Sequence, residues 1–193
     1  MTARCAVSHR FVATALAATG LLVVAGCGST ADNKRPLPCP RVSVLGDAAA
    51  LTRFAAGAGQ DLVDVDYQVE VSDILAGCKY EQSESDKQVI VVALAPVMVA
   101  IRGPANHDRE AQFDYFVSVV DSERDVLNKQ IFGVTVKFPG NLTRVSLTDN
   151  DPPVTVDIPL AAGRDATDYQ IFVGFQLTPD ELEYNRRRRN SLR

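Results

Sequence analysis

Several short runs of this 193-residue chain alternate between apolar and polar residues, and this pattern constrains the fold more than any other feature. The clearest run is VDYQVEV, residues 65–71, in which valine and tyrosine alternate with acidic and amide side chains. Successive side chains of a strand point to opposite faces of a sheet. The run therefore predicts a strand with one buried face and one wet face.

Two other runs are expected to pair as a hairpin. Residues 113–119 alternate except at Phe116, and residues 132–138 alternate phenylalanine and valine with small or polar residues. The polar segment DSERD, residues 121–125, follows the first run and is typical of a turn. Further strands are expected at residues 41–45, 142–147, 154–160 and 169–177.

The run VIVVALAPVMVAI, residues 89–101, differs because it is apolar on both faces. It is too short to span a bilayer, which takes ~20 apolar residues. We expect it to be the central strand of the core, or two short strands. Pro96 lacks a backbone N–H, so it indicates a bulge or a change of neighbouring strand at that point.

About eight strands with no regular alternation of strands and helices predict a mainly β fold, an antiparallel immunoglobulin-like β-sandwich. A barrel with a similar number of strands is the alternative. The chain contains no tryptophan, so the likeness to immunoglobulin domains concerns the architecture alone.

Two helical segments are expected beside the sheets. Residues 46–58, GDAAALTRFAAGA, could form two or three turns that begin at Asp47. A short C-terminal helix is expected over residues 179–187, because Thr178 can cap it, Pro179 suits its first position and Glu181 stands at capping-box spacing.

The N-terminal segment has the composition of a secretory signal peptide. Arg4 and Arg10 supply positive charge, and residues 11–26 are apolar apart from two threonines and end in small residues. A retained anchor helix is the alternative, but the apolar stretch is shorter than the ~20 residues that a bilayer requires.

The end of this segment, Val24-Ala25-Gly26-Cys27, resembles the lipobox of bacterial lipoproteins. The resemblance implies that a peptidase cleaves after Gly26 and that Cys27 carries lipid. In Gram-negative members of this class, an Asp after the cysteine commonly marks retention in the inner membrane. This chain has glycine there, which implies the periplasmic face of the outer membrane if the source is Gram-negative.

These inferences divide the chain into a signal peptide (residues 1–26), a lipidated tether (27–38) and a β-sandwich domain (39–193). The tether is polar and contains proline, which is typical of a flexible linker. Without the signal peptide, the chain has 18 basic and 24 acidic side chains, a net charge of −6. Nucleic-acid-binding domains are usually basic, so we expect no nucleic-acid partner.

Two of the four cysteines remain for the folded body. Cys5 and Cys27 belong to the signal and the anchor, which leaves Cys39 and Cys78. Two cysteines in an oxidising compartment most simply form a disulfide. A zinc site would need four N or S ligands, and the mature chain offers a single histidine, His107. We therefore expect a disulfide and no cofactor.

His107 lies in a polar segment with Asp108 and Glu110. A base beside carboxylates could act in general acid/base catalysis. The sequence shows no nucleophile motif to accompany it, so a solvated loop histidine is the favoured interpretation.

The segment LTDNDPPV, residues 147–154, is faintly similar to the Asp/Asn-Pro loops that bind calcium between cadherin domains. Asp149, Asn150 and Asp151 supply the oxygen ligands that calcium prefers. Asx residues before proline are also ordinary turn residues, and this is the favoured interpretation.

The segment RRRRNSLR, residues 186–193, concentrates positive charge in Arg186, Arg187, Arg188 and Arg189. These arginines could contact anionic lipid or an acidic protein surface. The alternative is a solvated helix end, where cations suit the negative pole of the helix.

The pattern as a whole favours a non-catalytic binding or scaffold module, held to the membrane by lipid and serving a protein partner in the cell envelope. A small-molecule-binding or calcium-binding lipoprotein is the first alternative, and a closed apolar cavity would favour it. A carboxylate-based hydrolase is the second, and it would require two convergent acids with raised pKa values.

Overall fold

The computed structural model describes residues 37–191 except residues 58 and 83–86. Leu37–Arg193 form one compact unit. The expected signal peptide, the expected lipidation site Cys27 and the expected tether up to residue 36 lie outside the described residues.

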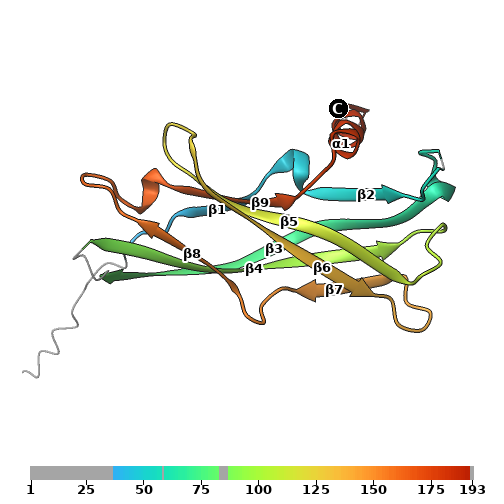
Figure 1. Ribbon diagram of the computed structural model, residues 1–193, viewed down its shortest axis with the longest axis horizontal. Coiled ribbons are helices and arrows are strands. Elements are labelled where there is room, and N and C mark those ends of the chain that lie inside the picture. Colours follow the sequence, from blue (N-terminus) through green and yellow to red (C-terminus); the bar gives the residue numbers. More distant parts are fainter. Residues whose placement is uncertain (1–36, 58, 83–86, 192–193) are drawn as a thin grey trace, which may run out of the picture. The chain divides into compact units, whose positions relative to one another are not determined.

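The described residues form nine strands in two sheets (Figure 1). The first sheet has the order β1 (Arg41–Val44), β9 (Gln170–Phe175), β5 (Glu110–Val120) and β6 (Val126–Lys137). The second has the order β2 (Ala50–Phe54), β3 (Val65–Gln82), β4 (Gln88–Arg102) and β7 (Arg144–Thr148), and β8 (Val154–Pro159) also pairs with β4. Strands β1 and β9 are parallel, and the other pairs are antiparallel. The predicted mainly β sandwich is confirmed.

The core lies between the inner faces of the two sheets. Every second side chain of a strand points inward, and in these strands the inward positions are the apolar ones of the alternating sequence pattern. Phe113 of β5 and Phe175 of β9 meet edge to face with their ring centroids 5.5 Å apart. The largest fully buried side chains include Leu51, Val69, Ile90, Leu94, Met98, Tyr115, Val117, Phe138, Val156, Ile171 and Phe175.

Strand β4 is continuous and central, and Pro96 marks a change of neighbour. On one side β4 pairs with β3 along its whole length. On the other side, Val89–Leu94 pair with β8 and Val97–Ile101 pair with β7. Pro96 lies between these two segments, where its missing N–H costs no ladder hydrogen bond on that side. The prediction of a central strand that changes neighbours at Pro96 is confirmed.

The prediction of a helix over residues 46–58 is wrong. Only a 3₁₀ turn, η1 (Gly46–Ala48), forms there, and β2 follows it and pairs with β3. Leu51 and Thr52 are buried in this strand. Alanine favours helices by less than about 1 kcal/mol per residue, and a short helix depends on tertiary packing for its stability. Pairing with the half-buried strand β3 therefore decides the conformation.

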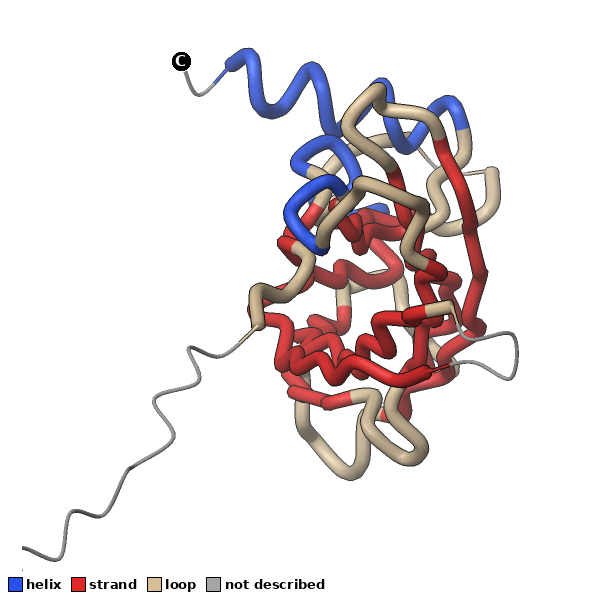
Figure 2. The backbone as a smooth tube through the Cα atoms, turned by 90° about the vertical axis from the view of Figure 1, so that its left-hand side faces the viewer, coloured by secondary structure: helices blue, strands red, loops and turns tan. Residues whose placement is uncertain are grey.

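The expected C-terminal helix, α1 (Pro179–Ser191), is present and runs beyond the predicted residue 187. Its capping box is formed: the Thr178 N–H donates to Glu181 Oε2 (2.8 Å), and the Glu181 N–H donates to Thr178 Oγ1 (3.3 Å). Figure 1 shows α1 beside β2, and Figure 2 shows it on the outside of the strands. Among the described residues, no helix has the length and hydropathy needed to cross a membrane.

Candidate functional site

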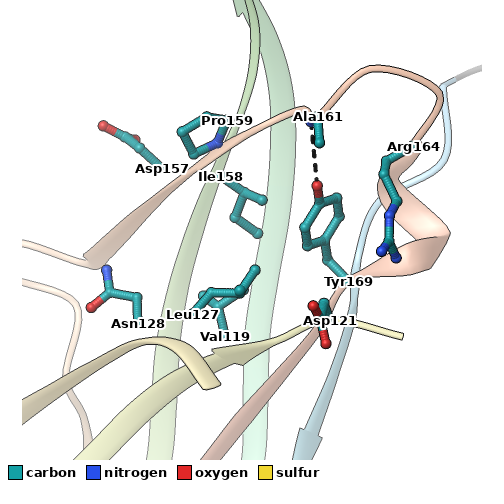
Figure 3. A pocket seen from close by; sticks show the side chains of 10 residues that line it. All are labelled: Val119, Asp121, Leu127, Asn128, Asp157, Ile158, Pro159, Ala161, Arg164 and Tyr169. Carbon is teal, nitrogen blue, oxygen red and sulfur yellow. Dashed lines mark hydrogen bonds between the residues drawn. The ribbon is translucent and has the colours of Figure 1, made fainter. Parts of the chain in front are cut away.

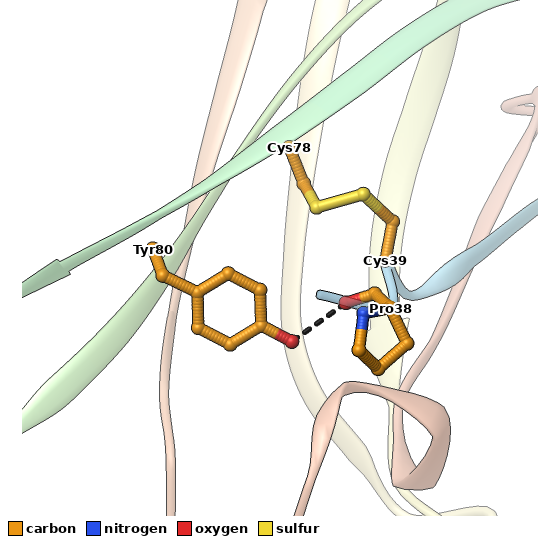
Figure 4. Close-up of a disulfide and its surroundings, with 4 residues drawn as sticks. All are labelled: Pro38, Cys39, Cys78 and Tyr80. Carbon is orange, nitrogen blue, oxygen red and sulfur yellow. Dashed lines mark hydrogen bonds between the residues drawn. A yellow bond between two sulfur atoms is a disulfide. The ribbon is translucent and has the colours of Figure 1, made fainter. Parts of the chain in front are cut away.

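One flank of the sandwich is closed by a disulfide (Figure 4). Cys39, just before β1 of the first sheet, is bonded to Cys78 in the second half of β3, and the two Cα atoms are 5.8 Å apart. The Tyr80 hydroxyl donates a hydrogen bond to the Pro38 carbonyl at 2.6 Å on the same side. The disulfide expected from the sequence is therefore formed, and it fixes the entry of the chain into the body.

The opposite flank is open and holds a pocket of about 400 Å³ (Figure 3). It lies between β6 at the edge of the first sheet and β8 at the edge of the second. Each of these strands pairs with a single described strand. The pocket is lined by Val119, Asp121, Leu127, Asn128, Asp157, Ile158, Pro159, Ala161, Arg164 and Tyr169.

The pocket combines an apolar floor with a polar rim. Val119 and Ile158 are buried and form part of the floor, whereas Leu127 is 53% exposed. The Tyr169 hydroxyl accepts a hydrogen bond from the Ala161 N–H at 3.4 Å, as Figure 3 shows. The site can therefore take an apolar group against Leu127, with polar groups of a ligand at the rim.

The turn between β5 and β6 is held in shape by its own hydrogen bonds. Asp121 Oδ1 accepts from the N–H groups of Glu123 (3.1 Å) and Asp125 (2.9 Å). Arg164 donates to both carboxylate oxygens of Glu123 at 2.9 and 2.8 Å. This hydrogen-bonded cation holds the pKa of Glu123 below its usual value. The rim of the pocket is thus preformed.

Further along the open flank, Tyr115 of β5 links the two sheets. Its hydroxyl donates to Asp149 Oδ2 at 2.6 Å, and its ring stacks on Phe132 of β6 with centroids 5.1 Å apart. Burial, and then the hydrogen bond to the Asp149 carboxylate, raise the pKa of Tyr115. Asp149, one of the calcium candidates, is therefore engaged in a contact between the sheets.

The other two calcium candidates lie in a turn. Asn150 forms an isolated β-bridge with Pro153, and Asp151 precedes a cis peptide bond to Pro152. Among the described residues, no three His, Cys, Asp or Glu side chains are grouped as metal ligands would be. Asp149 and Asp151 therefore belong to no such group among the described residues.

His107 and Asp108 are exposed in the loop between β4 and β5. This loop is organised by Asn106, whose role the sequence did not indicate. Asn106 is buried, and its Nδ2 donates to Asp66 Oδ1 (2.7 Å) and to the Glu110 carbonyl (2.8 Å). The hydrogen bonds among described residues do not include His107.

The four arginines of α1 differ in their contacts. Arg186 Nε lies 3.2 Å from Asp47 Oδ2, and Arg189 pairs with the other oxygen of the same carboxylate. Arg187 donates to Gln60 Oε1 at 3.1 Å. Hydrogen bonds from Arg189 and Arg186 lower the pKa of Asp47. Three of the four arginines therefore contact residues of the body outside the helix.

The carboxyl groups whose pKa is shifted within the described part of the chain are Asp47, Glu123 and Asp165. All three are shifted downward, by arginine partners at Asp47 and Glu123 and by hydrogen bonds from Thr167 at Asp165. The pair of acids with raised pKa values that a hydrolase would require is therefore not found among them.

Sequence reasoning missed the pocket, because its lining comes from three strand ends and two loops. The exposed pair Val126 and Leu127, which directly follows the DSERD turn, was the available signal. No family model, curated protein or solved structure matches this chain.

Proposed function

We propose that this protein is a lipid-anchored, non-catalytic binding or scaffold module on the periplasmic face of the outer membrane. The anchor is supported by the lipobox-like Val24-Ala25-Gly26-Cys27 and by the polar tether that follows it. The Cys39–Cys78 disulfide supports an exported body, because disulfides persist in oxidising compartments.

The single observation that carries the binding role is the open flank between β6 and β8. An apolar-floored pocket and an exposed strand edge lie side by side there. Sites that bind partners combine apolar surface with a few fixed polar groups, and the Arg164–Glu123 pair supplies such groups at the rim. The pocket is partly open to the surface, which fits a protein segment better than an enclosed small molecule.

The binding role can be tested by site-specific photo-crosslinking in intact cells. A photoreactive residue replaces Leu127 in the pocket, and the matched control replaces Leu142, which is equally exposed at 54% but lies in the loop before β7. We expect a discrete crosslinked protein from position 127 and none from position 142. Equal crosslinking from both positions, or none from either, would argue against a binding site on this flank.

The anchor is tested separately with Cys27→Ser. This variant should accumulate as an unlipidated precursor and leave the detergent phase on partitioning, because the thiol that would carry lipid is gone. Normal processing and partitioning of the variant would contradict the lipoprotein assignment.

A further inference from the structure

Strand β6 is a long edge strand with apolar side chains in the open. Among the described strands it pairs with β5 alone, over most of its length. Val126, Leu127 and Ile131 are 63%, 53% and 55% exposed. An unpaired strand edge is a template on which another extended chain can add by main-chain hydrogen bonds.

The residues whose backbone groups face this open edge follow from the hydrogen-bond pattern. The Phe138 N–H donates to the Arg109 carbonyl at 2.8 Å, so this pair exchanges hydrogen bonds. In an antiparallel ladder, hydrogen-bonded pairs alternate with pairs whose N–H and C=O groups point away. The even-numbered residues of β6 therefore bond to β5. The backbone groups that face outward belong to Lys129, Ile131, Gly133, Thr135 and Lys137.

The edge of β8 on the same flank is blocked by prolines. The Leu160 N–H donates to the Gln88 carbonyl, so the outward-facing positions of β8 are Thr155, Asp157 and Pro159. Pro159 has no N–H to donate, and Pro153 directly precedes the strand. Proline at an edge strand prevents the addition of another strand. Strand β6 contains no proline.

The remaining described edges are short or covered. Strand β1 has four residues and β7 has five. Strand β2 is covered by α1, where Asn185 Nδ2 donates to the Ala50 carbonyl at 2.7 Å. The second half of β3 is linked by the disulfide to the segment that leads into β1. Strand β6 is thus the edge that is best suited to strand addition.

The charges of β6 indicate what the added strand should carry. The strand contains two lysines and no acid. Lys129 donates to the neutral Gln176 Oε1 at 2.9 Å and lies 4.5 Å from the centroid of the Phe116 ring. Lys137 is 77% exposed and lies 3.5 Å from Glu110 Oε1. Opposite charges on neighbouring strands stabilise pairing, so acidic residues should face Lys129 and Lys137.

The pocket indicates which side chains the added strand should carry on its inner face. Leu127 and Asn128, at the start of β6, line it. The side chains of an added strand alternate between the two faces of the sheet, and those on the inner face reach the pocket and the gap beside β8. These inward positions should be apolar.

We infer that β6 accepts an extended segment of a protein partner by antiparallel or parallel strand addition. The segment alternates apolar residues on its inner face with polar residues on its outer face, and it carries acids opposite Lys129 and Lys137. This inference rests on the proposed binding function and names the class of partner.

The test uses the mature chain and a synthetic twelve-residue peptide. Valine occupies alternate positions of the peptide, and two glutamates stand eight residues apart to match Lys129 and Lys137. A second peptide has lysine in place of both glutamates. Binding is measured by fluorescence anisotropy, and hydrogen exchange locates the site.

We expect the acidic peptide to bind and to protect the amides of Lys129, Ile131, Gly133 and Thr135 from exchange. Ile131→Pro removes an outward N–H without touching the β5 ladder, so it should weaken binding about tenfold or more. Thr155→Pro makes the same change at an outward-facing position of β8, whose edge is already blocked by proline, and this variant should bind the peptide like the unchanged protein. The lysine peptide should bind more weakly, most clearly at low salt.

Equal binding by Ile131→Pro and by the unchanged protein would overturn the inference, as would protection of amides elsewhere than β6. Circular dichroism of both proline variants establishes whether they are folded. If Ile131→Pro is not folded, Thr135→Pro removes another outward-facing N–H of β6 and takes its place in the test. The experiments distinguish failure of the binding function from failure of strand addition. A crosslink from position 127 that Ile131→Pro leaves unchanged would retain the binding function and reject strand addition.

Discussion

Tyr115 stabilises the sandwich through a single hydroxyl group. It is fully buried, and it donates to the half-buried carboxylate of Asp149, which directly follows β7 of the other sheet. A hydrogen bond to a charged group contributes more to stability than one between neutral groups, and an unpaired buried acceptor is costly. The hydrogen bond from Tyr115 to Asp149 should therefore contribute more to the free energy of unfolding than hydrogen bonds at the surface.

We predict that Tyr115→Phe lowers the free energy of unfolding by about 1–2 kcal/mol, because Asp149 loses its donor. Urea denaturation at neutral pH measures the change. The matched control is Tyr80→Phe, which removes the hydroxyl that donates to the Pro38 carbonyl near the surface and should cost less. If both variants lower the free energy of unfolding by the same amount, the hydrogen bond from Tyr115 to Asp149 contributes no more to stability than the one from Tyr80.

At the level of elements, α1 is held to the body by polar contacts rather than by a buried apolar face. None of its described side chains is buried. Asn185 donates to the Asp47 carbonyl (3.0 Å), Arg186 and Arg189 pair with the Asp47 carboxylate, and Tyr184 meets Phe54 edge to face at 5.2 Å. The docking of the helix should therefore depend on the charge of Asp47.

The pH dependence follows from the lowered pKa of Asp47. A group whose pKa is lower in the folded state contributes stability above its unfolded value, about 3.9 for Asp, and loses it as pH falls through the folded pKa. We predict that hydrogen-exchange protection in α1 is constant above about pH 5 and falls below about pH 4.

Asp47→Asn should lower this protection at neutral pH and remove its dependence on pH in the same range. Protection factors for the α1 amides, corrected for intrinsic exchange, measure both effects. Asp108→Asn is the control, because Asp108 is exposed in a loop and should leave α1 unchanged. Equal protection in the Asp47→Asn variant and the unchanged protein at neutral pH would contradict the role of this contact.

The sequence predicted those elements whose signal is local. Alternation located most strands, Pro96 marked the change of neighbour in β4, and the Thr178 capping box marked α1. It could not predict β2, because the alanine-rich segment around this strand suits a helix and only pairing with β3 makes residues 50–54 a strand. The first half of β6 was also missed, since VLNKQI does not alternate and its pairing with β5 provides the order.

The candidate site was less predictable for the same reason. Its residues come from β5, β6, β8 and two loops, and no local pattern connects Leu127 with Ile158 or Arg164. The motifs that do stand out in the sequence, such as the arginine run, include residues that serve internal contacts. Charge clusters and motifs can be read from a sequence. An unpaired strand edge can be identified only when the positions of the neighbouring strands are known.

For the whole molecule, the disulfide is the strongest single constraint on the unfolded chain. It joins residues 39 apart in sequence, and the chain-entropy model assigns a loop of this length about 4 kcal/mol. We predict that replacing Cys39 and Cys78 together by serine lowers the free energy of unfolding by about this amount. Guanidinium denaturation measures it, and the unchanged protein with reductant should match the variant. Equal stability of the oxidised and reduced forms would contradict the prediction.

The same bond determines how the body responds to mechanical tension. A pull on the chain at Leu37 reaches Cys39 and passes through the covalent bond to Cys78, in the long ladder of β3 with β4. Strands β1 and β2 lie within the closed loop and carry none of this load. Without the disulfide, the same pull would act first on the short parallel pairing of β1 with β9. Tension applied at the N-terminal end of the body therefore bypasses the pairing of β1 with β9 and enters the second sheet at β3.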